Sequence, residues 1–197
     1  MLFLLLSTSL VQAPGRDSVV YDLAPAPLTR FEVRTGKAGL LGFAGHEHLI
    51  QATSFSGRIV WYPDQPAAAH VSVSVPTERL EVVTPPDTAE IRKVTAAMRE
   101  DVLDVAHYPE ITLVAPVVAR GGDTLHLQAA LTIKGKTLEI PLTVRVNIGS
   151  DTLRASATFA VKQTDFGIRP YRGGPGGTVR VADRVTFTIE AVALRRR

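Results

Sequence analysis

A strict alternation of apolar and polar residues, repeated along the chain, constrains its fold more than any other feature. The alternation occupies six segments, which are residues 29–34, 71–75, 125–133, 138–148, 153–161 and 185–189. Successive side chains of a β-strand point to opposite faces, so each segment predicts a strand with one buried and one wet face. The alternation therefore predicts an all-β fold.

Short turn sequences separate several of these segments. Lys134-Gly135-Lys136 and Gly149-Ser150-Asp151 each leave only a few residues between two strands, which favours antiparallel hairpins. Strands with one apolar face bury that face either by stacking two sheets or by closing into a barrel. Alternation alone leaves both architectures open.

One segment breaks the alternation and predicts a helix. After Pro85 and Pro86, apolar residues recur at helical spacing: Ile91, Val94, Met98, Val102 and Val105. Asp87 and Glu90 have the spacing of a capping box, and Pro109, which lacks an amide donor, ends the segment. We expect one amphipathic helix, or two short ones, between residues 87 and 105, with the apolar stripe against the sheet.

Composition narrows the classes of function. The chain has 197 residues, 45% of them hydrophobic and 21% charged, as in an ordinary soluble domain. It has no cysteine, which excludes disulfides, thiolate metal sites and a cysteine nucleophile. The formal net charge is +3, and Arg195 to Arg197 supply three positive charges, so no nucleic-acid partner is expected. The sequence has no Gly-x-Ser-x-Gly nucleophile elbow, and we expect no enzyme activity.

The amino terminus predicts export. Leu2 to Leu6 form an apolar run, and Val11-Gln12-Ala13 offers the small-x-small pattern of a signal-peptidase site. No lysine or arginine precedes the run, so a frayed cytosolic terminus is the alternative. We expect a signal peptide at residues 1–13, one domain at residues 18–193, and a periplasmic or secreted mature protein. No transmembrane span is expected in the mature chain, since no other stretch approaches the ~20 apolar residues that a spanning helix needs.

Four motifs in chain order point to a known family. They are FAGHEH with FSG (residues 43–48 and 55–57), LD with YPEITL (103–104 and 108–113), LTIKG with IPL (131–135 and 140–142), and DFGI with VADRV (165–168 and 181–185). Together they resemble the YceI-like family of lipocalin-like, polyisoprenoid-binding proteins. The resemblance covers nearly the whole chain after about residue 19.

The resemblance implies an extended, eight-stranded, antiparallel lipocalin-like barrel with one short helical insertion. It implies a non-catalytic function, the binding of a long isoprenoid lipid such as a polyprenyl phosphate or a quinone relative, with no required cofactor. Eight strands enclose an interior that side chains can fill or that can hold one slim ligand, so a filled and a hollow barrel both remain open. The oligomeric state, a homodimer included, is not readable from the sequence.

We expect the ligand to contact inward-facing apolar side chains. The candidates are Phe31, Val33, Phe55, Ile59, Trp61, Val73, Ile111, Leu113, Leu131, Ile133, Phe159, Phe166 and Phe187. Phe166 precedes Gly167, for which a positive φ is expected, and is predicted to plug the barrel. In the glycine-rich loop after residue 168, Arg169, Tyr171 and Arg172 can hold an anionic headgroup, and a solvated hairpin is the alternative.

His46 and His48 suggest a second function. Residues two apart on a strand share a face, so the two imidazoles can bind a divalent metal if a third ligand converges. The candidates for that ligand are Glu47, His70, His107 and His126. On this hypothesis the protein is a periplasmic metal-handling or redox-accessory barrel. A headgroup-binding role and an ordinary structural role for the histidines are the alternatives.

Overall fold

The last strand, β12 (Val179–Arg195), organises the sheet because four other strands pair with it. The computed structural model describes residues 17–38, 47–84, 88–173 and 179–197. β10 (Thr152–Lys162) pairs with one edge of β12, and β11 (Arg172–Gly173) extends that edge. The other edge is divided between β1 (Val19–Leu23) and β2 (Arg30–Ala38). β1 and β2 thus occupy a single strand position in the sheet, interrupted between Leu23 and Arg30.

The Thr29 side chain bridges the interruption between β1 and β2. Its hydroxyl donates to the carbonyl of Val192 at 2.9 Å and accepts from the amide of the same residue at 3.0 Å. Ala24 also donates its amide to the Val192 carbonyl, at 2.8 Å. Because Thr29 is fully buried, this hydroxyl satisfies backbone groups that water cannot reach.

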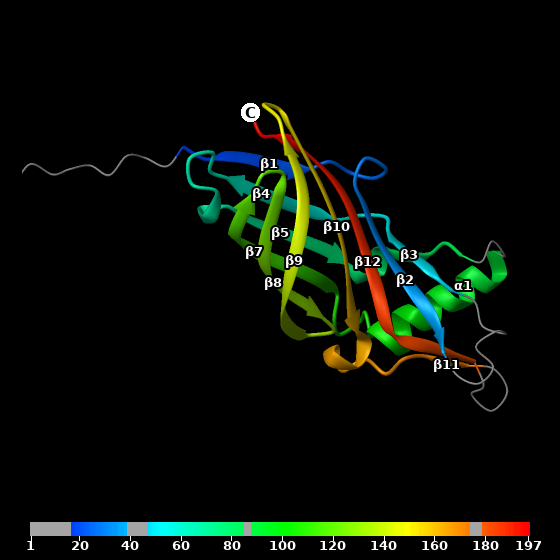
Figure 1. The fold of residues 1–197 in the computed structure, drawn as a ribbon. Helices are drawn as coiled ribbons and strands as arrows, with labels where there is room; N and C mark the ends of the chain where they lie inside the picture. Colours follow the sequence, from blue (N-terminus) through cyan, green and yellow to red (C-terminus); the bar gives the residue numbers. More distant parts are fainter. Residues whose placement is uncertain (1–16, 39–46, 85–87, 174–178) are drawn as a thin grey trace, which may run out of the picture.

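The sheet closes on itself after eight strand positions. Two more of these positions are interrupted: β3 (Leu49–Ala52) with β4 (Ser56–Trp61), and β5 (His70–Pro76) with β6 (Leu80–Val82). The remaining strands are β7 (Glu110–Gly121), β8 (Thr124–Ile133) and β9 (Lys136–Ile148). The hydrogen-bonded order β1-β4-β5-β7-β8-β9-β10-β12 returns to β1, and every pairing is antiparallel, which confirms the predicted barrel (Figure 1).

The helix occupies the place where β6 and β7 separate. α1 (Thr88–Ala97) continues into a π-helical turn, η4 (Met98–Leu103), which ends at Asp104 with a φ of 53°. The helix predicted between residues 87 and 105 is confirmed, while Asp87 of the expected capping box lies outside the described residues. Over the described ranges, no helix is long and apolar enough to cross a membrane.

Side chains of the helix bind the free edge of β6. The Arg99 guanidinium donates to the Leu80 carbonyl from Nε at 3.2 Å and from Nη2 at 2.9 Å. The Thr95 hydroxyl accepts from the Val82 amide at 3.2 Å, and Thr95 is buried. β3 pairs with one edge of β6, and the helix covers the other edge, which has no neighbouring strand in the described sheet.

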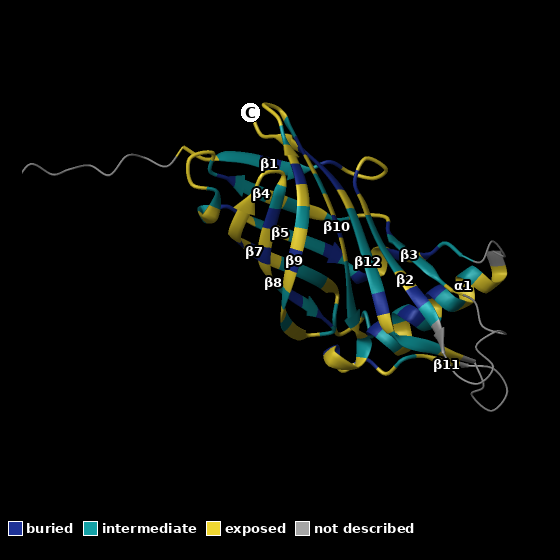
Figure 2. Cartoon of the chain, in the orientation of Figure 1, coloured by how far each residue is buried: buried dark blue, intermediate teal, exposed yellow. Residues whose placement is uncertain are grey.

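The buried residues follow the predicted alternation. On β8, Leu125, Leu127, Ala129, Leu131 and Ile133 are all buried, while the residues between them are exposed or half-buried (Figure 2). They divide between two core clusters along the barrel, one that includes Trp61 and Leu153 and one that includes Met98, Leu103 and Phe166.

The β8–β9 hairpin has the turn that its sequence predicts. Lys134 has a φ of 49° and Gly135 a φ of 72°, and these are the two residues between the paired Ile133 and Lys136. Positive φ at both central residues defines a type I′ turn, whose twist matches that of the flanking strands.

Candidate functional site

A cavity of about 250 Å³ lies inside the barrel and connects the two core clusters. Its lining includes Leu125 and Leu153 from one cluster and Met98 and Phe166 from the other. A single water molecule needs only ~10–15 Å³, so this volume is far more than a packing defect. The barrel is hollow, and its interior is elongated along the strands.

The lining is almost entirely apolar. Its polar members are Glu32, Thr35, His70 and Gln163. The Glu32 carboxylate accepts from the Gln51 amide nitrogen at 2.8 Å, and Gln163 Nε2 donates to the Ala182 carbonyl at 2.8 Å.

The Thr35 hydroxyl is also satisfied within the protein, since it accepts from the His48 amide at 3.1 Å. Among the described residues, no buried side-chain nitrogen or oxygen lacks a partner. The buried part of the wall, as far as the structure describes it, therefore presents no unsatisfied side-chain polar group to a ligand, and an apolar chain suits it.

Two aromatic pairs lie beside the cavity. Phe159 and Phe187 face each other across β10 and β12, with ring centroids 4.9 Å apart and planes at 4°, and both line the cavity. Phe31 also lines it, and its outer neighbour Phe55 packs edge-on at 4.8 Å with an interplanar angle of 80°. The Phe159–Phe187 pair is a cross-strand pair, which stabilises the sheet while it presents flat, apolar surface to the cavity.

One end of the cavity is blocked by the turn η5 (Gln163–Phe166). Phe166 is 2% exposed and Gly167 has a φ of 73°, which confirms the predicted left-handed position. Met98 and Leu103 of the helical segment pack in the same cluster. At the other end, Trp61 is buried beneath the guanidinium of Arg120, whose Cζ lies 5.2 Å from the ring centroid.

Most of the apolar residues predicted from the sequence lie against the cavity. These are Phe31, Val33, Ile59, Trp61, Val73, Ile111, Leu113, Leu131, Ile133, Phe159, Phe166 and Phe187. Phe55 packs on Phe31 outside the lining, and Arg169, Tyr171 and Arg172 are exposed and also lie outside it.

Sequence reasoning missed further lining residues. Examples are Leu125, Leu127, Leu142, Val146, Leu153, Met98 and Leu103. The signal for them was present, because the first five lie in the alternating segments and Met98 belongs to the helical stripe.

The histidines do not assemble a metal site in the described structure. His46 lies outside the described residues, and His48 Nδ1 is 2.9 Å from the Thr84 carbonyl oxygen. His107 Nδ1 is 2.8 Å from Asp104 Oδ1, and His126 Nδ1 is 3.4 Å from a threonine hydroxyl. In the ranges that the structure describes, no group of three histidine, cysteine, aspartate or glutamate side chains is placed to hold a metal ion.

Comparison with solved structures shows the same fold. BcnA from Burkholderia cenocepacia aligns with a TM-score of 0.66 and 17% identity over 83% of this chain and 95% of that chain. A polyisoprenoid binding domain from Saccharophagus degradans, implicated in plant cell wall breakdown, aligns with a TM-score of 0.63 and 13% identity over 89% and 98% of the two chains. The YCEI protein of Campylobacter jejuni aligns with a TM-score of 0.58 and 15% identity over 75% and 85%.

Comparison by sequence identifies the family. No curated protein matches this chain. The model of the YceI-like domain, however, matches residues 29–193, which include both core clusters except Tyr21 and all strands except β1 and the end of β12. This chain belongs to the YceI-like domain family.

Proposed function

We propose that the protein binds a long apolar lipid of the isoprenoid type inside the barrel and has no catalytic role. The single observation that carries the proposal is the elongated cavity, whose lining is apolar along its length and whose polar members are already hydrogen-bonded or exposed. Removal of apolar surface from water favours binding by ~25 cal/mol per Å². A slim hydrocarbon chain gains this free energy without leaving a polar group unpaired.

The comparisons support the choice of an isoprenoid chain. One of the similar structures is named a polyisoprenoid binding domain, and the alignment covers 89% of this chain. A polyprenyl phosphate and a quinone relative share such a chain and differ in their headgroups. In the described lining, Glu32 and His70 are the only side chains that can carry a charge. The proposal therefore places a charged headgroup outside the cavity.

The proposed place of action is the periplasm or the cell exterior. This rests on the leader expected at residues 1–13, which lies outside the described residues. Isolation of the mature protein from the periplasmic fraction, with an amino terminus near Pro14, tests it. Cytosolic protein that retains Met1 contradicts it.

Two alanine substitutions test the cavity. Ala157 lines it, whereas Ala129 is fully buried and lies outside the lining. We expect Ala157→Phe to occupy the cavity and abolish binding of a polyprenol or quinone probe while the melting temperature changes little. Ala129→Phe overpacks a filled region and should cost ~1–3 kcal/mol of stability.

Native mass spectrometry of protein purified without a tag gives the complementary result, the mass of a retained lipid. Probe binding by wild type and by both variants, measured beside their melting temperatures, completes the experiment. If wild type binds no apolar chain and both variants simply melt earlier, the proposed function is wrong.

A further inference from the structure

Five basic side chains gather at the end of the barrel that η5 closes. We call them the basic corner: Lys162, Arg169, Arg172, Arg180 and Arg184, all of them exposed. Arg172 is directly opposite Arg180 in the β11–β12 pairing, and Lys162 is directly opposite Arg184 in the β10–β12 pairing. Like charges directly opposite one another on neighbouring strands destabilise a sheet, so this arrangement calls for a negative partner.

The described part of the protein does not supply that partner. None of the five basic groups forms an ion pair within the ranges that the structure describes, whereas elsewhere on the surface Arg30 pairs with Glu190 and Arg58 with Asp22. Two carboxylates, Asp165 and Asp183, lie in the same region of the chain.

Asp183 forms hydrogen bonds with Thr164 and, in the described structure, no ion pair. Its carboxylate accepts from the Thr164 amide at 2.9 Å and from the Thr164 hydroxyl at 2.8 Å. These hydrogen bonds, helped by the charge of Lys162, hold the pKa of Asp183 below its ordinary value of 3.8. Asp183 therefore stabilises the turn η5, and the five basic groups keep an excess of positive charge.

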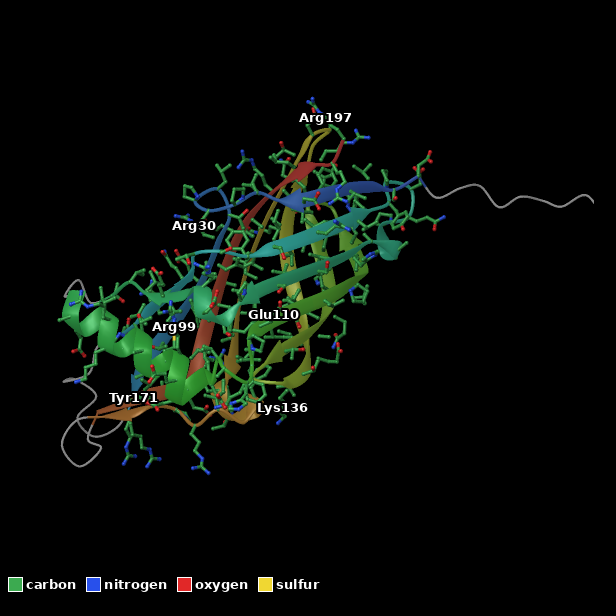
Figure 3. All side chains as sticks on the ribbon, turned by 180° about the vertical axis from the view of Figure 1, so that it is seen from behind. Arg30, Arg99, Glu110, Lys136, Tyr171 and Arg197 are labelled. Atoms are coloured by element: carbon green, nitrogen blue, oxygen red, sulfur yellow. The ribbon has the colours of Figure 1, made fainter. Side chains whose placement is uncertain are left out.

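An exposed aromatic residue lies among the basic groups. Tyr171 is 41% exposed and precedes Arg172, and its carbonyl accepts from the Val181 amide at 3.0 Å, which ties it to β12. Figure 3 shows Tyr171 at the end of the molecule remote from Arg197. Tyrosine is enriched at membrane–water interfaces, where one part of the ring is apolar and the hydroxyl is wet.

The basic corner also borders the cavity. Gln163, Ile168 and Val185 line the cavity, and they are the immediate sequence neighbours of Lys162, Arg169 and Arg184, respectively. A partner bound by these cations is therefore held beside the closed end of the barrel interior.

We propose that the basic corner docks the protein, this end first, on the surface of a bilayer rich in anionic phospholipid, with Tyr171 at the level of the headgroups. The cations are exposed and spread over β10, β11, β12 and the loop that carries Arg169. They do not converge in a buried pocket, and this arrangement suits the diffuse field of a charged surface better than one phosphate group. Each lysine or arginine near such a surface strengthens binding by about fivefold, and salt screens the effect. This inference goes beyond the proposed function, because docking and lipid uptake can fail separately.

Vesicle co-sedimentation of the full chain tests the docking. We expect wild type to bind vesicles of phosphatidylglycerol and phosphatidylcholine mixed in equal parts, to bind pure phosphatidylcholine weakly, and to be released by salt. Arg180→Gln with Arg184→Gln should weaken binding about 25-fold, from two cations at about fivefold each. Without vesicles the double variant should melt no earlier than wild type, because it removes one member of each like-charged pair.

The matched control removes two arginines from other parts of the barrel wall. Arg145 and Arg154 are exposed, form no ion pair in the described structure, and lie on β9 and β10 near the end that carries Arg197. Arg145→Gln with Arg154→Gln changes the net charge equally and should reduce vesicle binding much less. Equal losses in the two double variants would show an effect of net charge alone and overturn the proposal.

A charge-conserving variant separates a bilayer from a specific phosphate site. Arg180→Lys with Arg184→Lys should keep most of the vesicle binding, because a surface potential acts on charge and not on guanidinium geometry. Displacement from vesicles by millimolar inorganic phosphate at constant ionic strength, or loss of binding in the lysine variant, would identify a phosphate-recognition site and refute bilayer docking. Ala157→Phe, which tests the cavity, should dock normally, so failure of the lipid proposal is distinguishable from failure of this one.

Discussion

Gly135 shows how much a single backbone position contributes to the barrel. Its φ of 72° lies in the left-handed region, and a Cβ added there would come within 2.6 Å of Tyr108 Cε1. Tyr108 in turn lies just after the helical segment, so the β8–β9 turn packs against the chain that leaves the helix. A glycine is required at this position both for its φ and for the space beside it.

Gly122 provides a matched comparison for Gly135. It has a φ of 61°, but a Cβ there meets nothing within 4 Å. We expect Gly122→Ala to cost about 1 kcal/mol from the left-handed backbone alone. Gly135→Ala should cost about 1–3 kcal/mol more, because the tyrosine ring must move. Urea unfolding of both variants measures the difference in their free energies of unfolding. Equal losses of stability would show that the Tyr108 ring moves aside without cost.

Single residues also show how far the sequence predicted the site. Phe159, Phe187 and Leu131 were placed inward by alternation, because a period of two decides which face a side chain occupies. Phe55 lies outside the lining because it is in the break between β3 and β4, where alternation no longer determines which face a side chain occupies. Tyr171 lies beyond η5, and no periodic pattern relates it to the cavity.

At the scale of elements, the helix was predictable and its partner was not. The apolar stripe that includes Met98 predicted a helix against the sheet, and Met98 is buried. The apolar stripe does not predict the hydrogen bonds of the polar residues Thr95 and Arg99 to the free edge of β6. That contact depends on the separation of β6 from β7, which begins where the strand is interrupted between β5 and β6.

The hydrogen bond between Thr95 and Val82 gives a test of this contact. Thr95→Val keeps the shape of the side chain but leaves the buried Val82 amide without an acceptor, which should cost ~1–3 kcal/mol. Thr95→Ser retains the hydroxyl and should retain most of the stability. Hydrogen exchange at the Val82 amide, measured beside thermal unfolding, should accelerate in the valine variant only. Unchanged exchange there would mean that the helix does not protect the edge.

At the scale of the whole molecule, charged side chains tie together the two ends of the described chain. Asp22 on β1 accepts from Arg196 Nε at 2.7 Å, from Arg196 Nη2 at 3.0 Å and from Arg58 Nε at 3.2 Å. The hydrogen bond from Arg196 is the largest cause that holds the pKa of Asp22 below its ordinary value of 3.8. The three residues join β1, β4 and the residue that follows β12, where the barrel closes.

The lowered pKa fixes the direction of a pH effect. A carboxyl with a lower pKa in the folded state adds stability above its unfolded pKa of 3.8, and that contribution disappears as the pH falls through the lowered value. Asp22→Asn should therefore melt earlier than wild type near neutral pH, and the two should converge in strong acid. Asp64→Asn, which alters a carboxyl without an ion pair in the described structure, is the control. A difference that persists at the lowest pH would contradict the assignment.

Closure of the barrel has a consequence for the order in which the protein can be made. β1 pairs with the last residues of β12, and Asp22 and Arg196 are 174 positions apart in the chain. During synthesis, β1 and β2 emerge long before β12, and the edge of each that pairs with β12 stays unpaired until β12 leaves the ribosome. Folding dominated by such distant pairings is slow, so the nascent chain requires either delayed folding or a partner that shields its strand edges until β12 is available.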